Sequence, residues 1–161
     1  MPINVGDKIP EGGFTTMTAD GPKPVTTSEL FDGKKVVLFG LPGAFTPTCS
    51  AKHLPGYVSN ADALKGKGVD TIACMSVNDA FVMGAWGKDQ GAGDKVMMLA
   101  DGSAEMAKKL GLELDLTARG MGVRATRFSM LVENGVVKSV NLEPNPGEAE
   151  ASGAEAMLGQ V

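Results

Sequence analysis

A chain of 161 residues has room for one hydrophobic core, so we expect a single domain over residues 1–161. With 43% apolar and 21% charged residues, the chain has the composition of a soluble globular protein, and no run approaches the roughly 18 apolar residues that a membrane span requires. The net charge of −4 and the scatter of the 15 basic residues argue against nucleic acid as a partner.

Three apolar runs are predicted to be buried strands, with helices between them. The strands are expected at 35–41, 69–77 and 96–100, and their near-continuous apolar character is typical of a sheet covered on both faces. Residues 48–66 and 78–90 have helical patterns, in which Pro55 predicts a kink or restart and Asn78 an N-cap. A shorter helix, capped by Ser103, is predicted to end before Gly111.

The pattern changes in the last third of the chain. Residues 126–133 and 136–142 alternate around Asn134-Gly135, the sequence of a type I′ turn, and so predict a β-hairpin. The Ala/Glu-rich tail at 146–160 suits a terminal helix, and 115–123 is predicted to be a long loop that could form a wall or lid. The fold class expected is α/β, with a mixed central sheet, an edge hairpin and helices on both faces.

The stretch PGAFTPTC follows the first predicted strand and ends in one of only two cysteines. Thr46 is predicted to cap a helix that begins at Pro47, which places Cys49 in the first helical turn. Unpaired backbone N–H groups and the positive end of the helix dipole favour a thiolate there. The alternative is that Cys49 is simply a small buried residue in a capped helix.

Arg127 is the second candidate for a functional residue. In ATRFSML, alternation places Arg127 on one face with Ser129 and Leu131, while Thr126, Phe128 and Met130 take the other. A charge in a core-type strand must face a partner or an anion. The pattern alone leaves open an ordinary ion pair with one of the 19 acidic residues.

Other kinds of site are poorly supported by the cysteine and histidine content. Two cysteines and one histidine cannot build a closed zinc site, and no CxxC motif is present, so neither a metal nor another cofactor is expected. The N-terminal residues show no secretory or transit pattern, so we expect a cytoplasmic protein, in which a structural disulfide is not expected either. Of the functions that cysteine can have in such a protein, chemistry by a free thiol is the one that remains.

The sequence also resembles the peroxiredoxins. GLPGAFTPTCS, with Pro42, Thr46 and Cys49 in Pro-x-x-x-Thr-x-x-Cys spacing, resembles their active-site signature. The segments AKHLPGY, CMSVNDAFVMGAW and RFSMLVENGVV resemble the atypical type II group that includes peroxiredoxin 5, and the resemblance covers essentially the whole chain. It implies a thioredoxin-like fold, which agrees with the predicted order of elements.

The resemblance implies a thiol-dependent peroxidase for hydrogen peroxide and organic hydroperoxides, acting in antioxidant defence and redox homeostasis. Cys49 would be the peroxidatic cysteine, which becomes a sulfenic acid; Thr46 and Arg127 would bind thiolate and peroxide, and Pro42 would exclude water. Lowering a thiol pKa from about 8.5 to 6 raises its thiolate fraction at pH 7 only about thirtyfold. Aligned donors must therefore stabilise the breaking O–O bond as well.

Further expectations follow from position in the family pattern. Phe45, Leu116 and Met121 are predicted to line the substrate pocket, and members of the group commonly form homodimers. His53, four positions after Cys49, is expected to supply a supporting hydrogen bond rather than direct proton transfer.

The second cysteine, Cys74, lies in a predicted buried strand. Some relatives resolve the sulfenic acid with a cysteine near the C-terminus, but the corresponding region here, EPNPGEAEASGAE, contains none. An external thiol, from glutathione, a glutaredoxin or a thioredoxin, is therefore the expected reductant. Cys74 is expected to be a packing residue; a resolving role would require the helical turn at Cys49 to unwind toward it.

The sequence also bears on three other functions. A cysteine phosphatase needs an arginine six positions after its nucleophile, where this chain has Pro55. Thiol-disulfide exchange is disfavoured because its usual CxxC motif is missing. A redox sensor, in which oxidised Cys49 signals through a bound client, stays open because only turnover distinguishes it from a peroxidase.

Overall fold

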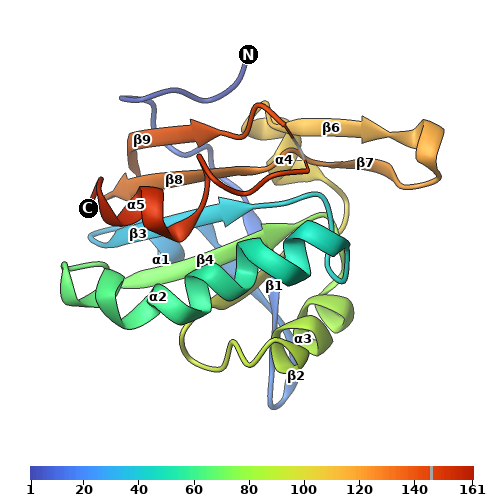
Figure 1. The fold of residues 1–161 in the computed structure, drawn as a ribbon, viewed down its shortest axis with the longest axis horizontal. Coiled ribbons are helices and arrows are strands. Elements are labelled where there is room, and N and C mark those ends of the chain that lie inside the picture. Colours follow the sequence, from blue (N-terminus) through green and yellow to red (C-terminus); the bar gives the residue numbers. More distant parts are fainter. Residues whose placement is uncertain (146) are drawn as a thin grey trace.

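The computed structural model describes residues 1–145 and 147–161. Within this part of the chain, seven strands form one mixed sheet in the order β2-β1-β5-β4-β3-β8-β9 (Figure 1). The strands are β1 (Gly13–Thr18), β2 (Gly21–Thr26), β3 (Lys35–Gly40), β4 (Thr71–Ser76), β5 (Met97–Ala100), β8 (Phe128–Glu133) and β9 (Val136–Leu142). The predicted mixed central sheet is confirmed.

The three parallel strands β3, β4 and β5 lie at the centre of this sheet, and antiparallel hairpins complete both sides. Strand β8 pairs antiparallel to β3, with Phe39 opposite Ser129, and β9 continues beyond β8. The turn between β8 and β9 has φ angles of 48° at Asn134 and 77° at Gly135. Both are left-handed, as a type I′ turn requires, so the predicted hairpin is also confirmed.

Helices cover both faces of the sheet. α2 (Leu54–Gly66), α3 (Ala80–Asp89) and α5 (Ala154–Leu158) pack on one face, in front of the sheet in Figure 1. α1 (Thr27–Phe31) and α4 (Glu105–Lys109) pack on the other face. A hydrophobic core lies on each face of the sheet. Side chains of β3 pack alternately into one core and the other, because successive side chains of a strand point to opposite faces.

The helix that carries Cys49 begins irregularly. The backbone is helical from Pro47, but Cys49–His53 forms a π-helical turn in which the Leu54 N–H donates to the Cys49 carbonyl. Pro55 has no N–H, and its ring would clash with a carbonyl four residues earlier in a regular α-helix. The wide turn takes the place of the predicted kink or restart, and such turns are frequent at functional sites.

The predicted loop at 115–123 is wrong, because these residues belong to a second, smaller sheet. β6 (Glu113–Leu116) and β7 (Gly122–Ala125) pair antiparallel around a 3-10 turn, Thr117–Arg119. Gly120, with φ 72°, reverses the chain after that turn. The hairpin projects as an arm from the main sheet (Figure 1). Each strand has only four residues; Glu113–Leu116 alternates polar and apolar side chains, but Gly122–Ala125 does not, and so short an alternation does not identify a strand on its own.

Two predicted helix caps are corrected. Asp79 caps α3, with its carboxylate accepting from the Val82 N–H at 2.9 Å, so Asn78 is not the cap. Ala104, with φ 60°, precedes α4 in place of Ser103, and Asp101 accepts from the first N–H groups of that helix. Cap identity depends on the orientation of neighbouring residues with similar capping ability, which sequence does not resolve.

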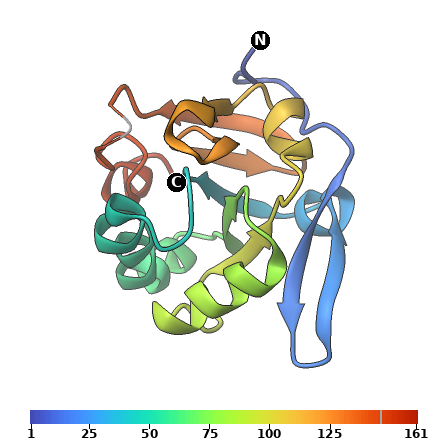
Figure 2. The same ribbon diagram turned by 90° about the vertical axis from the view of Figure 1, so that its right-hand side faces the viewer.

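The two ends of the chain also differ from the prediction. The sequence pattern predicts no structure for β1, β2 and α1. The hairpin of β1 and β2 forms the far edge of the sheet (Figure 2). The predicted terminal helix at 146–160 is only α5, and Pro146, where it was to begin, lies outside the described residues.

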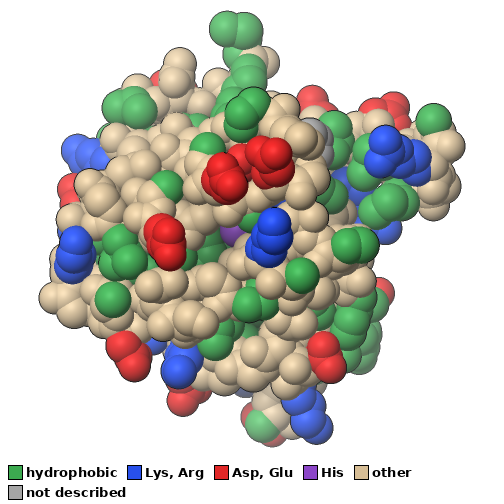
Figure 3. Space-filling model, in the orientation of Figure 1, with side chains coloured by type: hydrophobic (Ala, Val, Ile, Leu, Met, Phe, Trp, Pro, Cys, Tyr) green, Lys and Arg blue, Asp and Glu red, His purple; other side chains and the backbone are tan. Residues whose placement is uncertain are grey.

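The surface shows no single-sign concentration of charge on the face drawn in Figure 3, where acidic and basic side chains are interspersed. Across residues 1–145 and 147–161, no helix combines the length and apolar character needed to cross a membrane.

Candidate active site

Cys49 lies where the chain leaves the carboxyl end of β3 and enters the π-helical turn. Its side chain is completely buried, with 0% exposure. The preceding turn is closed by hydrogen bonds from the Thr46 hydroxyl to the Gly43 carbonyl at 2.7 Å, and from the Ser50 N–H to the Thr46 carbonyl at 3.0 Å. Thr46 thus lies just before the helix, but the predicted side-chain cap is wrong, because its hydroxyl donates to Gly43 and only its carbonyl accepts from the first turn. Cys49 falls in the first helical turn, where backbone N–H groups lack intrahelical partners.

Arg127 brings a buried positive charge to this thiol. It precedes β8 and is only 2% exposed, and its backbone carbonyl accepts from the Glu143 N–H at 3.0 Å. Its Nη2 donates to Cys49 Sγ at 3.2 Å, and its Nη1 donates to His53 Nδ1 at 3.0 Å. A guanidinium in this position stabilises negative charge on the sulfur through a charge-assisted hydrogen bond.

His53 is held as a neutral ring by its two partners. Its Nε2 lies 3.1 Å from the Ser152 carbonyl, an acceptor, so Nε2 carries the proton and Nδ1 accepts from Arg127. Burial and then the Arg127 charge lower the pKa of His53 to about 3, although the Ser152 carbonyl and the Glu143 charge act in the opposite direction. The predicted supporting hydrogen bond is present and reaches Arg127.

A cavity of about 350 Å³ opens beside these residues. Its lining combines three of the four predicted catalytic residues with the β6–β7 arm: Pro42, Thr46, Pro47, Thr48, Leu114, Leu116, Arg119, Met121, Arg127 and Gly147. Cys49 is not in this lining, but Arg127 connects the cavity to its sulfur. A larger cavity of about 540 Å³, between β1, α3 and β5, is lined by none of these residues.

The predicted pocket wall is partly corrected. Leu116 and Met121 line the cavity, but Phe45 does not. Phe45 has a left-handed backbone with φ 62° and is 55% exposed, and its ring centroid lies 6.4 Å from that of Trp86. The neighbouring α3 helix provides an aromatic contact for this ring outside the cavity.

Two residues without a predicted role in the site hold the loop around Pro42. Arg124 donates to the carbonyls of Met121 at 2.8 Å, Val77 at 3.3 Å and Pro42 at 3.4 Å. Asn78 accepts from the Ala44 N–H at 3.0 Å and from the Ser76 hydroxyl at 2.6 Å. An arginine among apolar residues is the sequence signal that could have identified Arg124 as a buried hydrogen-bond donor. Asn78 was missed because the sequence predicts it to be a helix cap.

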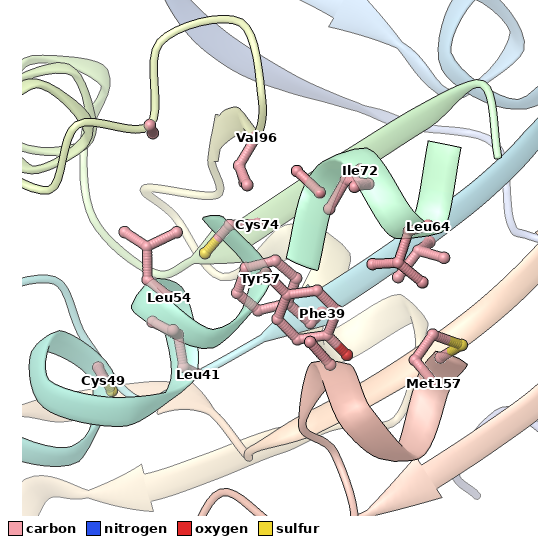
Figure 4. Close-up of a cluster of buried hydrophobic side chains, with 14 of the residues drawn as sticks. Phe39, Leu41, Cys49, Leu54, Tyr57, Leu64, Ile72, Cys74, Val96 and Met157 are labelled. Atoms are coloured by element: carbon pink, nitrogen blue, oxygen red, sulfur yellow. The ribbon is translucent and has the colours of Figure 1, made fainter. Parts of the chain in front are cut away.

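Cys74 occupies a different setting, in the middle of β4. It is completely buried among apolar residues, and Leu41 lies between the two sulfur atoms in the view of Figure 4. Burial, followed by the nearby Cys49, raises the pKa of Cys74 well above its ordinary value, although Arg127 acts in the opposite direction. Both cysteines are free thiols in this structure.

Among the residues that the structure describes, no cluster of three or more His, Cys, Asp or Glu side chains could hold a metal ion. The polar groups beside Cys49 are instead the Arg127 guanidinium, which donates to the sulfur, and the neutral imidazole that this guanidinium also contacts. Such a set can stabilise an anion on sulfur and developing charge on an oxygen bound beside it.

Proteins of known family are similar to this chain in sequence and in fold. The profile of the Redoxin family matches residues 4–158. Peroxiredoxin-2E of Arabidopsis thaliana, named as chloroplastic, is 53% identical over 160 residues, which cover 97% of this chain and 68% of that protein. Peroxiredoxin-2D of the same plant is 49% identical over 158 residues, which cover 98% and 97%.

Two solved structures of peroxiredoxins are similar to this chain in fold and sequence. Reduced Prx3 from Vibrio vulnificus, crystallised in complex with hydrogen peroxide, is 51% identical, with a TM-score of 0.93 and 98% of both chains covered. Peroxiredoxin 5 from Alvinella pompejana is 38% identical, with a TM-score of 0.84 and 98% and 96% covered. These likenesses confirm the expected thioredoxin-like fold. The chain belongs to the Redoxin family, and it is a type II peroxiredoxin, a thiol-dependent peroxidase.

Proposed function

We propose that Cys49 is the residue at which hydroperoxides are reduced. The observation that carries this assignment is the contact from Arg127 Nη2 to Cys49 Sγ at 3.2 Å, in a buried helix start beside a cavity. The thiolate attacks the terminal oxygen, so that an S–O bond forms as the O–O bond breaks. Cys49 becomes a sulfenic acid, and the leaving oxygen takes a proton to become water or an alcohol.

The residues around the cavity would assist this step in different ways. The Arg127 guanidinium contacts the sulfur and also reaches the cavity, so it can stabilise charge on both reacting atoms. Thr46 lines the same cavity, and because its hydroxyl proton is donated to Gly43, its oxygen can accept a hydrogen bond from peroxide. Buried Pro42 limits the access of water. The apolar side chains of Leu114, Leu116 and Met121 support the reduction of organic hydroperoxides as well as hydrogen peroxide.

An external thiol would complete the cycle. Cys74 is held in the middle of β4, and the C-terminal stretch 143–155 has no cysteine, so a thiol of glutathione, glutaredoxin or thioredoxin is the proposed reductant. That thiol attacks the sulfenic sulfur, releasing water and leaving a mixed disulfide. A second thiol then displaces Cys49 and leaves with the first as a disulfide.

Turnover measurements test this proposal directly. Wild type is given hydrogen peroxide or tert-butyl hydroperoxide, with glutathione plus glutaredoxin or, separately, with thioredoxin and its reductase. We expect many equivalents of peroxide to be consumed with at least one donor, and mass spectrometry of peroxide-treated protein to place the sulfenic acid at Cys49. A single oxidation without turnover under every donor would favour the redox sensor instead.

We also propose that the chain forms a homodimer through the surface next to the active site. Phe81, at the start of α3, is 68% exposed, and Phe45 is 55% exposed against Trp86 of the same helix. Two exposed aromatic side chains, one on α3 and one in contact with it, favour burial against another molecule. Sedimentation velocity on wild type and Phe81→Ser should show a dimer that is weakened by the substitution; identical monomers would contradict the proposal.

A cytoplasmic location is the remaining proposal. Both cysteines are free in the structure, which suits a reducing compartment. Fractionation of the source cells, followed by detection of the protein, would test it; recovery from an organelle, as the name of one relative records for that protein, would contradict it.

A further inference from the structure

A set of buried hydrogen bonds connects His53 to Ser152 and Glu143, in addition to the contact between Arg127 and Cys49. His53 makes one hydrogen bond through each ring nitrogen, to Arg127 Nη1 and to the Ser152 carbonyl. Only the tautomer with its proton on Nε2 satisfies both, because an Nδ1 proton would face the Arg127 N–H. The position of the Ser152 carbonyl therefore decides which lone pair Arg127 meets.

The same Ser152 carbonyl serves a second ring of the helix. The Tyr57 hydroxyl donates to it at 2.8 Å, and the Tyr57 ring stacks on Phe39 with centroids 4.0 Å apart. Helix side chains four residues apart thus converge on one buried acceptor. Ser152 itself is 0% exposed, so water does not compete for this carbonyl.

Glu143 fixes the Ser152 peptide. One carboxylate oxygen of Glu143 accepts from the Ser152 N–H at 3.0 Å and from its hydroxyl at 2.8 Å, and the other accepts from the Ala151 N–H at 3.4 Å. Glu143 is 7% exposed. Burial alone would raise the pKa of this carboxyl, but the hydrogen bonds from residues 150–152 outweigh it and hold the pKa below its ordinary value. The carboxylate is therefore ionised at neutral pH.

Glu143 also holds the main chain of Arg127. Its backbone N–H donates to the Arg127 carbonyl at 3.0 Å, which continues the pairing of β9 with β8 beyond Leu142. One residue thus holds Arg127 at two points: directly through the backbone, and through Ser152 and His53 at the guanidinium. Truncating the carboxylate should disturb the second point and leave the first in place.

We propose that Glu143 and Ser152 are positioning residues for peroxide reduction: the carboxylate clamps the Ser152 peptide, whose carbonyl locks the tautomer of His53 and so aims Arg127 Nη2 at Cys49. This inference rests on the proposed roles of Cys49 and Arg127. It assigns to Glu143 and Ser152 no contact with substrate.

The test combines a rate with a signature of the His53 ring. Single-turnover oxidation by hydrogen peroxide is followed by stopped-flow fluorescence of Trp86, the only tryptophan, whose indole donates to Ser50 beside Cys49 at 3.0 Å. The ¹⁵N shifts of the ring nitrogens report the tautomer without ambiguity, because His53 is the only histidine. Variants are Glu143→Ala, Glu143→Gln and Ser152→Ala, with exposed Glu155→Ala and Glu155→Gln as matched controls.

We expect Glu143→Ala to lower the oxidation rate constant about tenfold, since small misplacements of catalytic groups are costly, and to shift the ring toward a mixture of tautomers. Glu143→Gln keeps the side-chain volume and one carbonyl acceptor, so it should retain more of the rate and decides the question if the alanine variant does not fold. Ser152→Ala loses only the hydroxyl and should change the rate least. The Glu155 controls should match wild type.

Two results would overturn the inference: a Glu143→Gln or folded Glu143→Ala protein that oxidises at the wild-type rate, or a slower variant whose His53 shifts are unchanged. A wild-type protein that does not react with peroxide would instead refute the proposed function.

Discussion

The two cysteines of this protein lie in the same hydrophobic cluster, and both have 0% exposure. Cys49 is at the start of a helix and receives a hydrogen bond from Arg127 at 3.2 Å. Cys74 is in mid-strand, where its backbone is paired with β3 and β5 and its side chain meets apolar neighbours. Burial is therefore common to Cys49, the proposed reactive thiol, and to Cys74, and it does not distinguish them.

The difference lies in what faces each sulfur. At Cys74, burial raises the pKa well above its ordinary value, so the thiol stays protonated and weakly nucleophilic. At Cys49, a guanidinium and the free N–H groups of a helix start can stabilise an anion in the same apolar surroundings. A low dielectric strengthens those interactions, so burial assists catalysis where donors are present and suppresses it where they are not.

Exchanging the thiols for inert side chains should give the largest contrast. Cys49→Ser should abolish peroxide turnover, since a serine hydroxyl is not ionised at neutral pH. Cys74→Ala should keep turnover within about twofold of wild type, as expected for a residue away from the reacting atoms. Steady-state consumption with each donor measures both. Loss of turnover in Cys74→Ala with a normal first oxidation would make Cys74 a resolving thiol.

Removing the Arg127 guanidinium should leave Cys49 as a buried thiol without a charged donor, and so as unreactive toward peroxide as Cys74 is expected to be. We expect Arg127→Met to lower the rate constant of Cys49 oxidation about 100-fold or more, on the scale of losing a transition-state donor. Arg127→Lys keeps the charge but lacks the fork that joins Sγ to His53, so its rate should be intermediate. Stopped-flow oxidation measures both variants, and a lysine variant at the full wild-type rate would show that charge alone suffices.

The neutral ring beside Arg127 predicts a pH-dependent stability. His53 has a folded pKa of about 3 against an ordinary value of 6.5, so the unfolded chain binds more protons between these values. The contribution of neutral His53 to the free energy of unfolding is fully present above pH 6.5 and is lost as the pH falls from 6.5 toward 3. Urea unfolding at pH 7.5 and pH 5 should differ by about 2 kcal/mol.

A matched variant assigns that loss of stability. His53→Gln should show a smaller decrease between the two pH values, because it removes the only histidine. An equal decrease in wild type and His53→Gln would trace the effect to other groups. Below pH 4.5, protonation of Glu143 should destabilise the fold further, since its folded pKa is lowered from 4.5.

The smallest expected effect concerns the packing of Cys74. Cys74→Ala should lower the free energy of unfolding by about 1 kcal/mol, because it leaves a small cavity in a tightly packed core. Urea unfolding at pH 7.5 measures this, with the exposed Ser103→Ala as a control for a surface change. An unchanged stability would mean that the core closes around the missing sulfur.

Much of the fold could be predicted because its signals are local. The apolar runs that became β3, β4 and β5 and the Asn-Gly turn between β8 and β9 follow from side-chain periodicity and backbone preference over a few residues. The β6–β7 arm and the cap of α3 could not, since four-residue strands and adjacent capping residues are compatible with alternative structures of similar energy.

By itself, the sequence determined the spacing of Pro42, Thr46 and Cys49, because these residues share one loop and one helical turn. It also indicated that Arg127 must meet a partner, because a buried charge cannot remain uncompensated. Only the tertiary structure decided what that partner is, and which residues hold it there. His53 and Ser152 are 99 residues apart along the chain, and a hydrogen bond between such distant segments leaves no periodic trace in the sequence. Glu143 and Ser152 are nine residues apart, but they lie in an irregular segment whose contacts no periodicity predicts.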